Sequence, residues 1–242
     1  MLRRQRGGDY MADDFQRTIS LGDILTEATA MIGRNAVLLV LAAAVLAGEL
    51  FLFDAIARQM GPATQAARLL YALANLPIRT LFDYTITALL ISSERFNPHG
   101  CSITTLGSYI ALSIISGLGM VFGFILLIVP GLILLLRWSV AGNFAIAQRL
   151  GPIASLRASW HATRGSAGAI FGMLVLLGMV SLVGLFAISG HFSGTPTPLT
   201  PVMTGVRDVF QGLLGAVGIC VNVAIYALLV GAHDRDIGDV FA

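Results

Sequence analysis

Long apolar runs, broken by few charged residues, dominate the pattern of this chain. From Phe96 to Leu136 the sequence contains no Asp, Glu, Lys or Arg. As a single helix, residues 109–147 would measure roughly 58 Å at 1.5 Å per residue, about twice the ~30 Å hydrocarbon core of a bilayer. This length predicts two helices and a reversal of the chain between them.

The pair Pro130 and Gly131 lies in the middle of that run. Proline lacks an N–H and clashes with the preceding turn, so it ends helices, and glycine accepts the backbone angles of a tight turn. We therefore predict that Pro130 and Gly131 form the corner of a transmembrane helical hairpin. The alternative is one long helix kinked at Pro130, because membrane helices tolerate proline.

Further apolar runs predict an all-α, polytopic membrane protein with six transmembrane helices. The six spans are placed at about 36–53, 76–93, 108–128, 132–148, 167–189 and 208–231. They belong to a single membrane domain over residues 20–232. Residues 1–19 are expected to be a disordered N-terminus, and residues 233–242 a cytoplasmic tail.

Two short amphipathic helices are predicted at the membrane surface. The first, residues 20–34, begins with a capping box, in which the Ser20 hydroxyl accepts a backbone N–H and Asp23 reaches back. Apolar residues then recur at helical spacing on one face. Because this helix is one-sided and too short to span, we expect it in the headgroup region.

The second amphipathic helix is predicted to begin at Pro152, since proline suits the first helical position. Trp160 is suited to the headgroup level, and Arg157, His161 and Arg164 mark the other, polar face. Basic side chains at a membrane surface attract anionic lipid. These four residues are therefore candidates for contacts with lipid headgroups, and we expect the lipid bilayer, including its anionic lipid, as a partner.

The composition agrees with a membrane protein. Of the 242 residues, 56% are hydrophobic and 12% are charged, whereas about a quarter of the residues of a soluble domain are charged. The net charge of +2 is too small to indicate a nucleic-acid partner.

Arginines indicate the orientation of the chain. Six spans put both termini on one side of the membrane. Of the 15 basic residues, all arginine, Arg137 lies within a span, four lie on or near the far side (Arg58, Arg68, Arg79 and Arg207), and the other ten lie on the terminal side. Because basic residues accumulate on the cytoplasmic side, both termini are predicted to be cytoplasmic.

Charged residues in the spans form the candidate site. Glu49, Asp83 and Arg137 each lie ~9 Å below the outer boundary when residues are counted along their helices at 1.5 Å each. A charge near the membrane centre costs ~2.5–3.5 kcal/mol and is normally paired. We predict that Arg137 bridges Asp83, Glu49 or both, with Arg79 at the rim. This intramembrane charge layer either stabilises the fold or forms a site for a substrate or a proton.

Small and polar residues within the spans suggest close helix contacts. Asn143 and Asn222 either extend the polar interior or bond neighbouring helices. Glycines at small-residue spacing let helix backbones approach closely. They are Gly119, Gly123, Gly168, Gly172, Gly212, Gly215 and Gly218. They indicate close packing within one bundle or, alternatively, a face for a homo-oligomer or an unknown protein partner.

Motifs for catalysis are absent from the sequence. It contains no G-x-S-x-G elbow, no H-E-x-x-H and no P-loop. The histidines, His99, His161, His191 and His233, are scattered over predicted loops and helix ends, which argues against a metal site. No cofactor is expected, and no residue is assigned a catalytic role.

Residues 128–172 read IVPGLILLLRWSVAGNFAIAQRLGPIASLRASWHATRGSAGAIFG. The Pro-Gly corner, the span, the short loop and the helix with Ser and Trp that ends in Thr-Arg-Gly resemble the YciC-like bacterial inner-membrane proteins. Their relatives include the membrane domain of glycerophosphoryl diester phosphodiesterases. The resemblance implies a six-helix fold in the bacterial inner membrane, and it implies no activity, because that family has no settled one.

Three functions are compatible with the sequence. The first is a non-enzymatic membrane domain that acts as a scaffold or envelope-associated partner. The second is a small transporter or channel that uses the intramembrane charge layer. The third, a membrane-embedded enzyme, has the least support, because no nucleophile and base fall together. A polar cavity that reaches the charge layer distinguishes the second function from the first, since only a transporter needs one.

Overall fold

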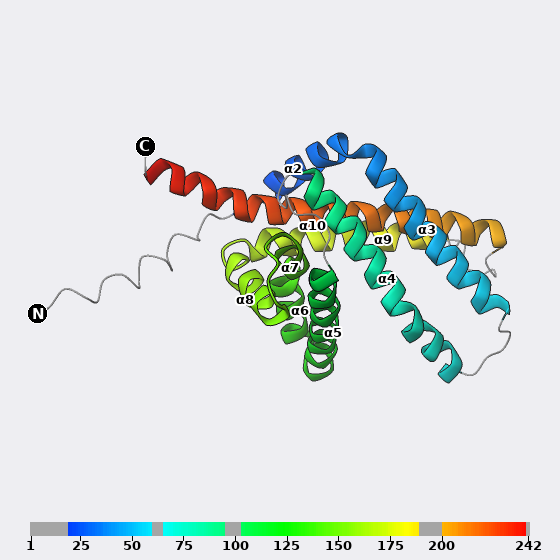
Figure 1. The fold of residues 1–242 in the computed structure, drawn as a ribbon. Coiled ribbons are helices and arrows are strands. Elements are labelled where there is room, and N and C mark those ends of the chain that lie inside the picture. Colours follow the sequence, from blue (N-terminus) through cyan, green and yellow to red (C-terminus); the bar gives the residue numbers. More distant parts are fainter. Residues whose placement is uncertain (1–18, 60–64, 95–102, 189–199, 241–242) are drawn as a thin grey trace, which may run out of the picture.

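The computed structural model describes residues 19–59, 65–94, 103–188 and 200–240, and every element in that part of the chain is a helix (Figure 1). The all-α class predicted from the apolar runs is therefore confirmed. The predicted disordered segment 1–19 lies, apart from Ile19, outside the described residues. The helices are α2 (Leu21–Arg34), α3 (Ala36–Gln59), α4 (Gln65–Ser93), α5 (Ile103–Leu126), α6 (Ile128–Trp138), α7 (Ala141–Ala147), α8 (Pro152–Ala162), α9 (Ala167–Ile188) and α10 (Pro201–Val240).

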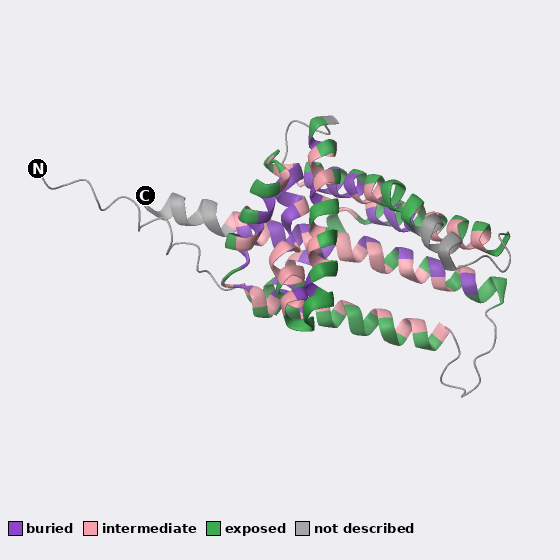
Figure 2. Cartoon of the chain, turned by 90° about the horizontal axis from the view of Figure 1, so that it is seen from below, coloured by how far each residue is buried: buried purple, intermediate pink, exposed green. Residues whose placement is uncertain are grey.

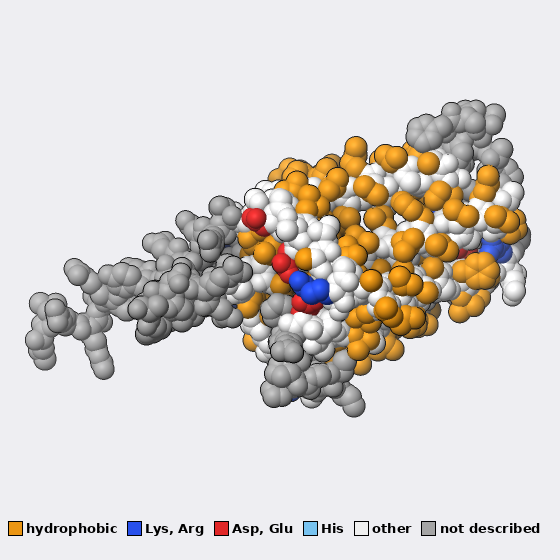
Figure 3. All heavy atoms as spheres, turned by 90° about the horizontal axis from the view of Figure 1, so that it is seen from above, with side chains coloured by type: hydrophobic (Ala, Val, Ile, Leu, Met, Phe, Trp, Pro, Cys, Tyr) orange, Lys and Arg blue, Asp and Glu red, His pale blue; other side chains and the backbone are white. Residues whose placement is uncertain are grey.

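Five helical segments of the described chain are long and apolar enough to cross a membrane. They are Ala36–Gln59, Thr104–Leu126, Ile128–Ala147, Ala167–Ile188 and Pro201–Gly231. Large apolar side chains cover much of their outer surface, as the orange atoms of Figure 3 show. Helix α4 is also long enough to cross, but it carries Arg79 and Asp83 and is not among the five.

The helices pack in two groups. Helices α2, α3 and α9 pack around α10, whereas α5, α6, α7 and α8 pack on one another. Figure 1 shows the pair α5–α6 pointing away from the first group, across the direction in which α9 and α10 run. Helices α4 and α7 touch members of both groups and lie at their junction.

The core of the fold lies at the end of the bundle where α2 meets α10. Figure 2 shows the buried residues concentrated there, while the far ends of the long helices are mostly exposed or half-buried. Ile24 and Met31 of α2 are completely buried in this core, as is Cys220 of α10. The Cys220 thiol lies 3.8 Å from the Ala28 carbonyl, to which it donates. Helix α2 therefore packs on the middle of α10.

A close contact between α3 and α10 explains part of the glycine pattern. A Cβ added to Gly212 would lie 2.6 Å from the Ala43 carbonyl oxygen and 2.7 Å from the Ala47 nitrogen. The absence of a side chain therefore lets the two backbones touch. On α9, by contrast, a Cβ on Gly168 would meet nothing within 4 Å. The homo-oligomer alternative stays a prediction.

Helices α5 and α6 form an antiparallel hairpin, but the corner differs from the prediction. The chain turns at Leu127, which has an extended backbone and is the N-cap of α6. Pro130 lies within the first turn of α6, where the N–H that it lacks needs no helical partner. Gly131 packs against Gly123, because a Cβ on Gly123 would lie 2.9 Å from the Gly131 Cα. The proline and glycine thus begin the second helix and let it pack closely; they do not make the turn.

Helix α4 begins earlier than the predicted second span. We expected the second span to begin at about residue 76. Instead, α4 runs without a break from Gln65 to Ser93, with Pro77 inside it. The structural reason is that a helix loses only one backbone hydrogen bond at a proline, and neighbouring groups can compensate for it.

Other predicted boundaries also shift. The first span continues to Gln59, and the last one begins at Pro201 and stays helical to Val240, so most of the expected tail 233–242 is helix. A helix can continue past the end of an apolar run, because polar residues form the same backbone hydrogen bonds in the next turn. The predicted fourth span 132–148 is interrupted at Ser139 and Val140, which separate α6 from α7.

The local signals for the short helices agree with the structure. Ser20 caps α2: its hydroxyl accepts from the Asp23 N–H at 3.1 Å, and its own N–H donates to the Asp23 carboxylate at 2.9 Å. Pro152 occupies the first turn of α8. The placement of both helices in the headgroup region stays a prediction, since the apolar face of α2 is covered by α9 and α10.

Candidate functional site

A polar cavity lies at the junction of the two helix groups. Its volume is about 450 Å³, and α3, α4, α5, α6, α7, α9 and α10 all contribute to its wall. Besides three serines, its polar lining consists of Arg79, Asp83, Thr87, Tyr109, Asn143 and Asn222. In a chain whose helices are otherwise apolar, this gathering of polar groups marks the candidate site.

The charges of the cavity come from one face of α4. Arg79 and Asp83 are four residues apart, so they lie one above the other on the helix. Both line the cavity, with Asp83 half-buried and Arg79 exposed. Arg79 and Glu49 are near enough to act on the Asp83 carboxylate electrostatically. Three of the four predicted layer residues are therefore gathered around α4.

The predicted bridge from Arg137 is not formed. Within the described part of the chain, no ion pair joins Arg137 to Asp83 or Glu49. The guanidinium carbon lies 5.6 Å from the centre of the Trp160 ring instead, a distance at which a cation interacts with an aromatic face. The side chain thus lies against Trp160 of α8, and it does not line the cavity. Counting residues places Arg137 in depth along its helix, but it does not show the direction of the side chain.

Asparagines connect the two helix groups beside the cavity. The Asn143 amide donates to the Asn222 side-chain oxygen at 2.7 Å and to its backbone carbonyl at 2.9 Å. The Asn222 amide donates in turn to the carbonyl of Ser139, at the break between α6 and α7, at 2.9 Å. Both expectations for these residues hold together, because they line the cavity and also bond neighbouring helices.

Aromatic and hydroxyl groups of α5 form a wall that our sequence analysis missed. Tyr109, Ser113 and Ser116 line the cavity, and the Tyr109 ring packs at 5.4 Å against Tyr84. A Cβ on Gly142 would lie 3.0 Å from Tyr109, so this glycine makes room for the ring. The spacing of the three polar residues, one every three or four, places them on one helix face and was the available signal.

Glu49 faces a different space. One of its oxygens, Oε1, accepts from the Asn75 amide at 3.2 Å, and both residues line a second cleft between α3 and α4. The other oxygen, Oε2, is buried without a hydrogen-bond partner. Glu49 therefore belongs to the surroundings of Asp83 but does not line the polar cavity.

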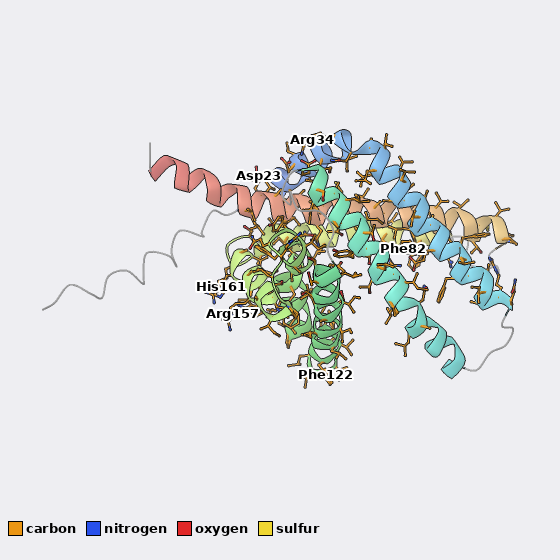
Figure 4. The ribbon with its side chains drawn as sticks, viewed as in Figure 1. Asp23, Arg34, Phe82, Phe122, Arg157 and His161 are labelled. Carbon is orange, nitrogen blue, oxygen red and sulfur yellow. The ribbon has the colours of Figure 1, made fainter. Side chains whose placement is uncertain are left out.

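The predicted lipid-headgroup residues lie on α8 and just beyond it. Arg157, His161 and Arg164 are exposed, and Figure 4 shows Arg157 and His161 on the outer side of α8. Trp160 is half-buried under the Arg137 guanidinium. The polar face is therefore accessible, and its contact with anionic lipid stays a prediction.

An ion cluster at the start of α10 was not expected. Arg207 bonds Asp54 of α3 and, at 2.9 Å, its neighbour Asp208. Asp208 is 2% exposed, and its second oxygen is buried without a hydrogen-bond partner. Because the first span was predicted to end at about residue 53, Asp54 was not expected to be part of α3 or to pair with the start of α10.

A second ion cluster joins α2 to the end of α4. Arg34 bonds Glu27 and Glu94, each at 3.0 Å, and Asn35 donates to Glu94 at 2.7 Å. Hydrogen bonds to Glu27 and Glu94 raise the pKa of Arg34 above its ordinary value. Figure 3 shows acidic and basic side chains together on this otherwise largely apolar face, and Figure 4 places Arg34 there. None of these residues lines the cavity, and the cluster joins α2 to the end of α4.

Groups that would hold a metal are not gathered in the described chain, where no three His, Cys, Asp or Glu side chains come together. Comparison with protein-family models, curated proteins and solved structures finds no match. The resemblance to the YciC-like proteins therefore stays a prediction. What the helices define is a class: a multi-pass, all-helical membrane protein.

Proposed function

We propose that this protein is a small transporter that binds a zwitterionic solute in the cavity between its two helix groups. The observation that supports this proposal is the placement of Arg79 and Asp83, opposite in charge and one turn apart, on the wall of a cavity of about 450 Å³. Asp83 would accept the ammonium group of the solute, and Arg79 would hold its carboxylate or phosphate.

The charges of Arg79 and Asp83 are energetically costly inside a membrane. An ionised side chain inside the membrane is expensive and normally marks a path or a binding site. If Arg79 and Asp83 only stabilised the fold, we would expect them in a closed, dry contact and not on the wall of a cavity lined by Tyr109 and two asparagines. The cavity also lies where the two helix groups meet, so a relative movement of the groups would change access to it.

The scaffold role expected from the sequence has no comparable support. It was inferred from the lack of catalytic motifs, and a scaffold requires no polar cavity. The distinguishing feature named at the outset, a polar cavity that reaches the charge layer, favours transport.

We further propose that α4 is the sixth span. Its mean hydropathy is lowered by Arg79 and Asp83, both of which face the cavity, so their charges need not contact lipid. Six crossings would place both ends of the membrane domain on one side. Together with the arginine distribution, this supports cytoplasmic termini in a bacterial inner membrane.

Solute binding can be tested on the protein in lipid nanodiscs. The measurement is a thermal-shift screen of glycine, glycine betaine, arginine and phosphoethanolamine, followed by equilibrium dialysis of the best radiolabelled solute. We expect Asp83→Asn and Arg79→Gln each to weaken binding by about tenfold or more, the equivalent of about 1.4 kcal/mol. Arg58→Gln, which removes an exposed arginine outside the cavity, is the matched control. Equal binding by Asp83→Asn and the unaltered protein, or no binding of any zwitterion, would refute the proposal.

A further inference from the structure

A second, mostly apolar cleft lies between α3 and α4. Its volume is about 400 Å³. Apolar side chains form nearly all of its wall, with Val45, Leu52, Phe53 and Ile56 from α3, and Ile78 and Phe82 from α4. Figure 4 shows Phe82 in the region where α4 faces α3. The polar side chains of the wall are Glu49 and Asn75.

Glu49 is only half satisfied in this cleft. Its Oε1 accepts from the Asn75 amide at 3.2 Å, whereas Oε2 is buried and has no hydrogen-bond partner. Among the described residues, no arginine lines the cleft. A carboxylate in apolar surroundings needs a compensating charge or donor, and a native structure that leaves one unpaired calls for an explanation.

We infer that this cleft binds a hydrophobic cation, with its positive centre at Glu49 and its hydrocarbon or aromatic body against the apolar walls. The carboxylate supplies the charge, and Phe53 and Phe82 offer aromatic faces that attract cations. An anionic ligand is disfavoured, because no basic side chain of the described residues lines the cleft, whereas the Glu49 carboxylate would repel it. A neutral ligand would leave the Glu49 charge without a partner.

This site is separate from the polar cavity. The two share no wall residue: Asn75, Ile78 and Phe82 line the cleft, whereas Arg79 and Asp83 line the cavity. The residues alternate along α4, so the helix presents two adjacent faces to two different spaces. The inference therefore does not rest on the solute proposed for the cavity, and the two can fail independently.

The test uses a pair of ions that match in size and shape and differ in the sign of their charge. Tritiated tetraphenylphosphonium is bound to the protein in nanodiscs, empty nanodiscs are subtracted, and tetraphenylborate is the comparison. We expect saturable binding of the cation and no saturable binding of the anion. Glu49→Gln keeps the size of the side chain and an oxygen for Asn75 but removes the charge, and we expect it to weaken cation binding by about tenfold or more.

Two further variants make the outcome decisive. Ser92→Ala, whose hydroxyl bonds only within α4 and which lines neither space, should change tetraphenylphosphonium binding by less than about twofold, or about 0.4 kcal/mol. Phe82→Ala should weaken it, because the ligand loses an aromatic wall. Each variant is first checked for an unchanged size-exclusion profile and unfolding midpoint. Equal cation binding by Glu49→Gln and the unaltered protein would overturn the inference, as would saturable tetraphenylborate binding at the cleft.

Discussion

Asn143 of α7 and Asn222 of α10 bond each other across the junction of the two helix groups. Two hydrogen bonds, of 2.7 and 2.9 Å, run from the Asn143 amide to Asn222, and Asn143 is 3% exposed. Because both residues also line the polar cavity, they hold its shape. The loss of these bonds would therefore be felt in both stability and solute binding.

Replacing either asparagine should destabilise the protein. Hydrogen bonds between membrane helices contribute about 0.6 kcal/mol on average and up to about 1.7, so we expect Asn143→Ala and Asn222→Ala each to lower the free energy of unfolding within that range. Because the residues bond each other, the double variant should cost less than the sum. Unfolding in mixed micelles by SDS titration measures this. Ser92→Ala, whose hydroxyl bonds only within α4, is the control, and strict additivity would contradict the coupling.

Gly212 and Gly218 of α10 form a matched pair for testing the α3–α10 contact. A Cβ on Gly212 would strike the α3 backbone, whereas a Cβ on Gly218 would meet nothing within 4 Å. We expect Gly212→Ala to cost about 1–3 kcal/mol through overpacking and Gly218→Ala to be neutral or slightly stabilising, since alanine favours helix. SDS titration compares the two, and equal midpoints would show that the backbones do not touch.

Arg207 should be more important for stability than its place near the end of a helix suggests. Its removal leaves Asp208, which is almost fully buried, without its cation. Removing one partner of a buried ion pair costs about 3–5 kcal/mol of stability. We expect the loss caused by Arg207→Gln to fall at the lower end of this range, because Arg207 itself is partly exposed. Arg58→Gln serves as the control. If adding Asp208→Asn to Arg207→Gln restores no stability, the explanation by an uncompensated charge is wrong.

Cysteine labelling in intact cells tests whether α4 crosses the membrane. Single cysteines at Ser20, Gln59 and Ser93 are introduced into a chain without Cys101 and Cys220, and intact cells are treated with an impermeant thiol reagent. With α4 as a sixth span, Gln59→Cys should react from outside, and Ser20→Cys and Ser93→Cys should react only after lysis. Reaction of Ser93→Cys from outside would mean that α4 does not cross and that the two ends of the chain lie on opposite sides.

Much of the helix content was readable from the sequence, since long apolar runs and capping residues such as Ser20 and Pro152 act locally. Helix ends were less readable. The helices α3 and α10 continue past the ends of their apolar runs, because backbone hydrogen bonding does not depend on the polarity of the next side chain. Pro130 also shows this limit: its local preference suits both a corner and a first helical turn, and only the packing of Gly131 on Gly123 selected the latter.

The site was only partly readable for a related reason. Glu49, Asp83 and Arg79 were found because a charge in an apolar run stands out, and they do gather around α4. The sequence by itself determined that the chain is an all-helical membrane protein with charged groups inside its helical bundle. Only the tertiary structure decided that Arg137 turns to Trp160, that Asp83 lines a polar cavity and that Glu49 lines an apolar cleft. The physical reason is that spacing places a side chain along its helix, whereas its surroundings depend on how that helix is rotated against its neighbours.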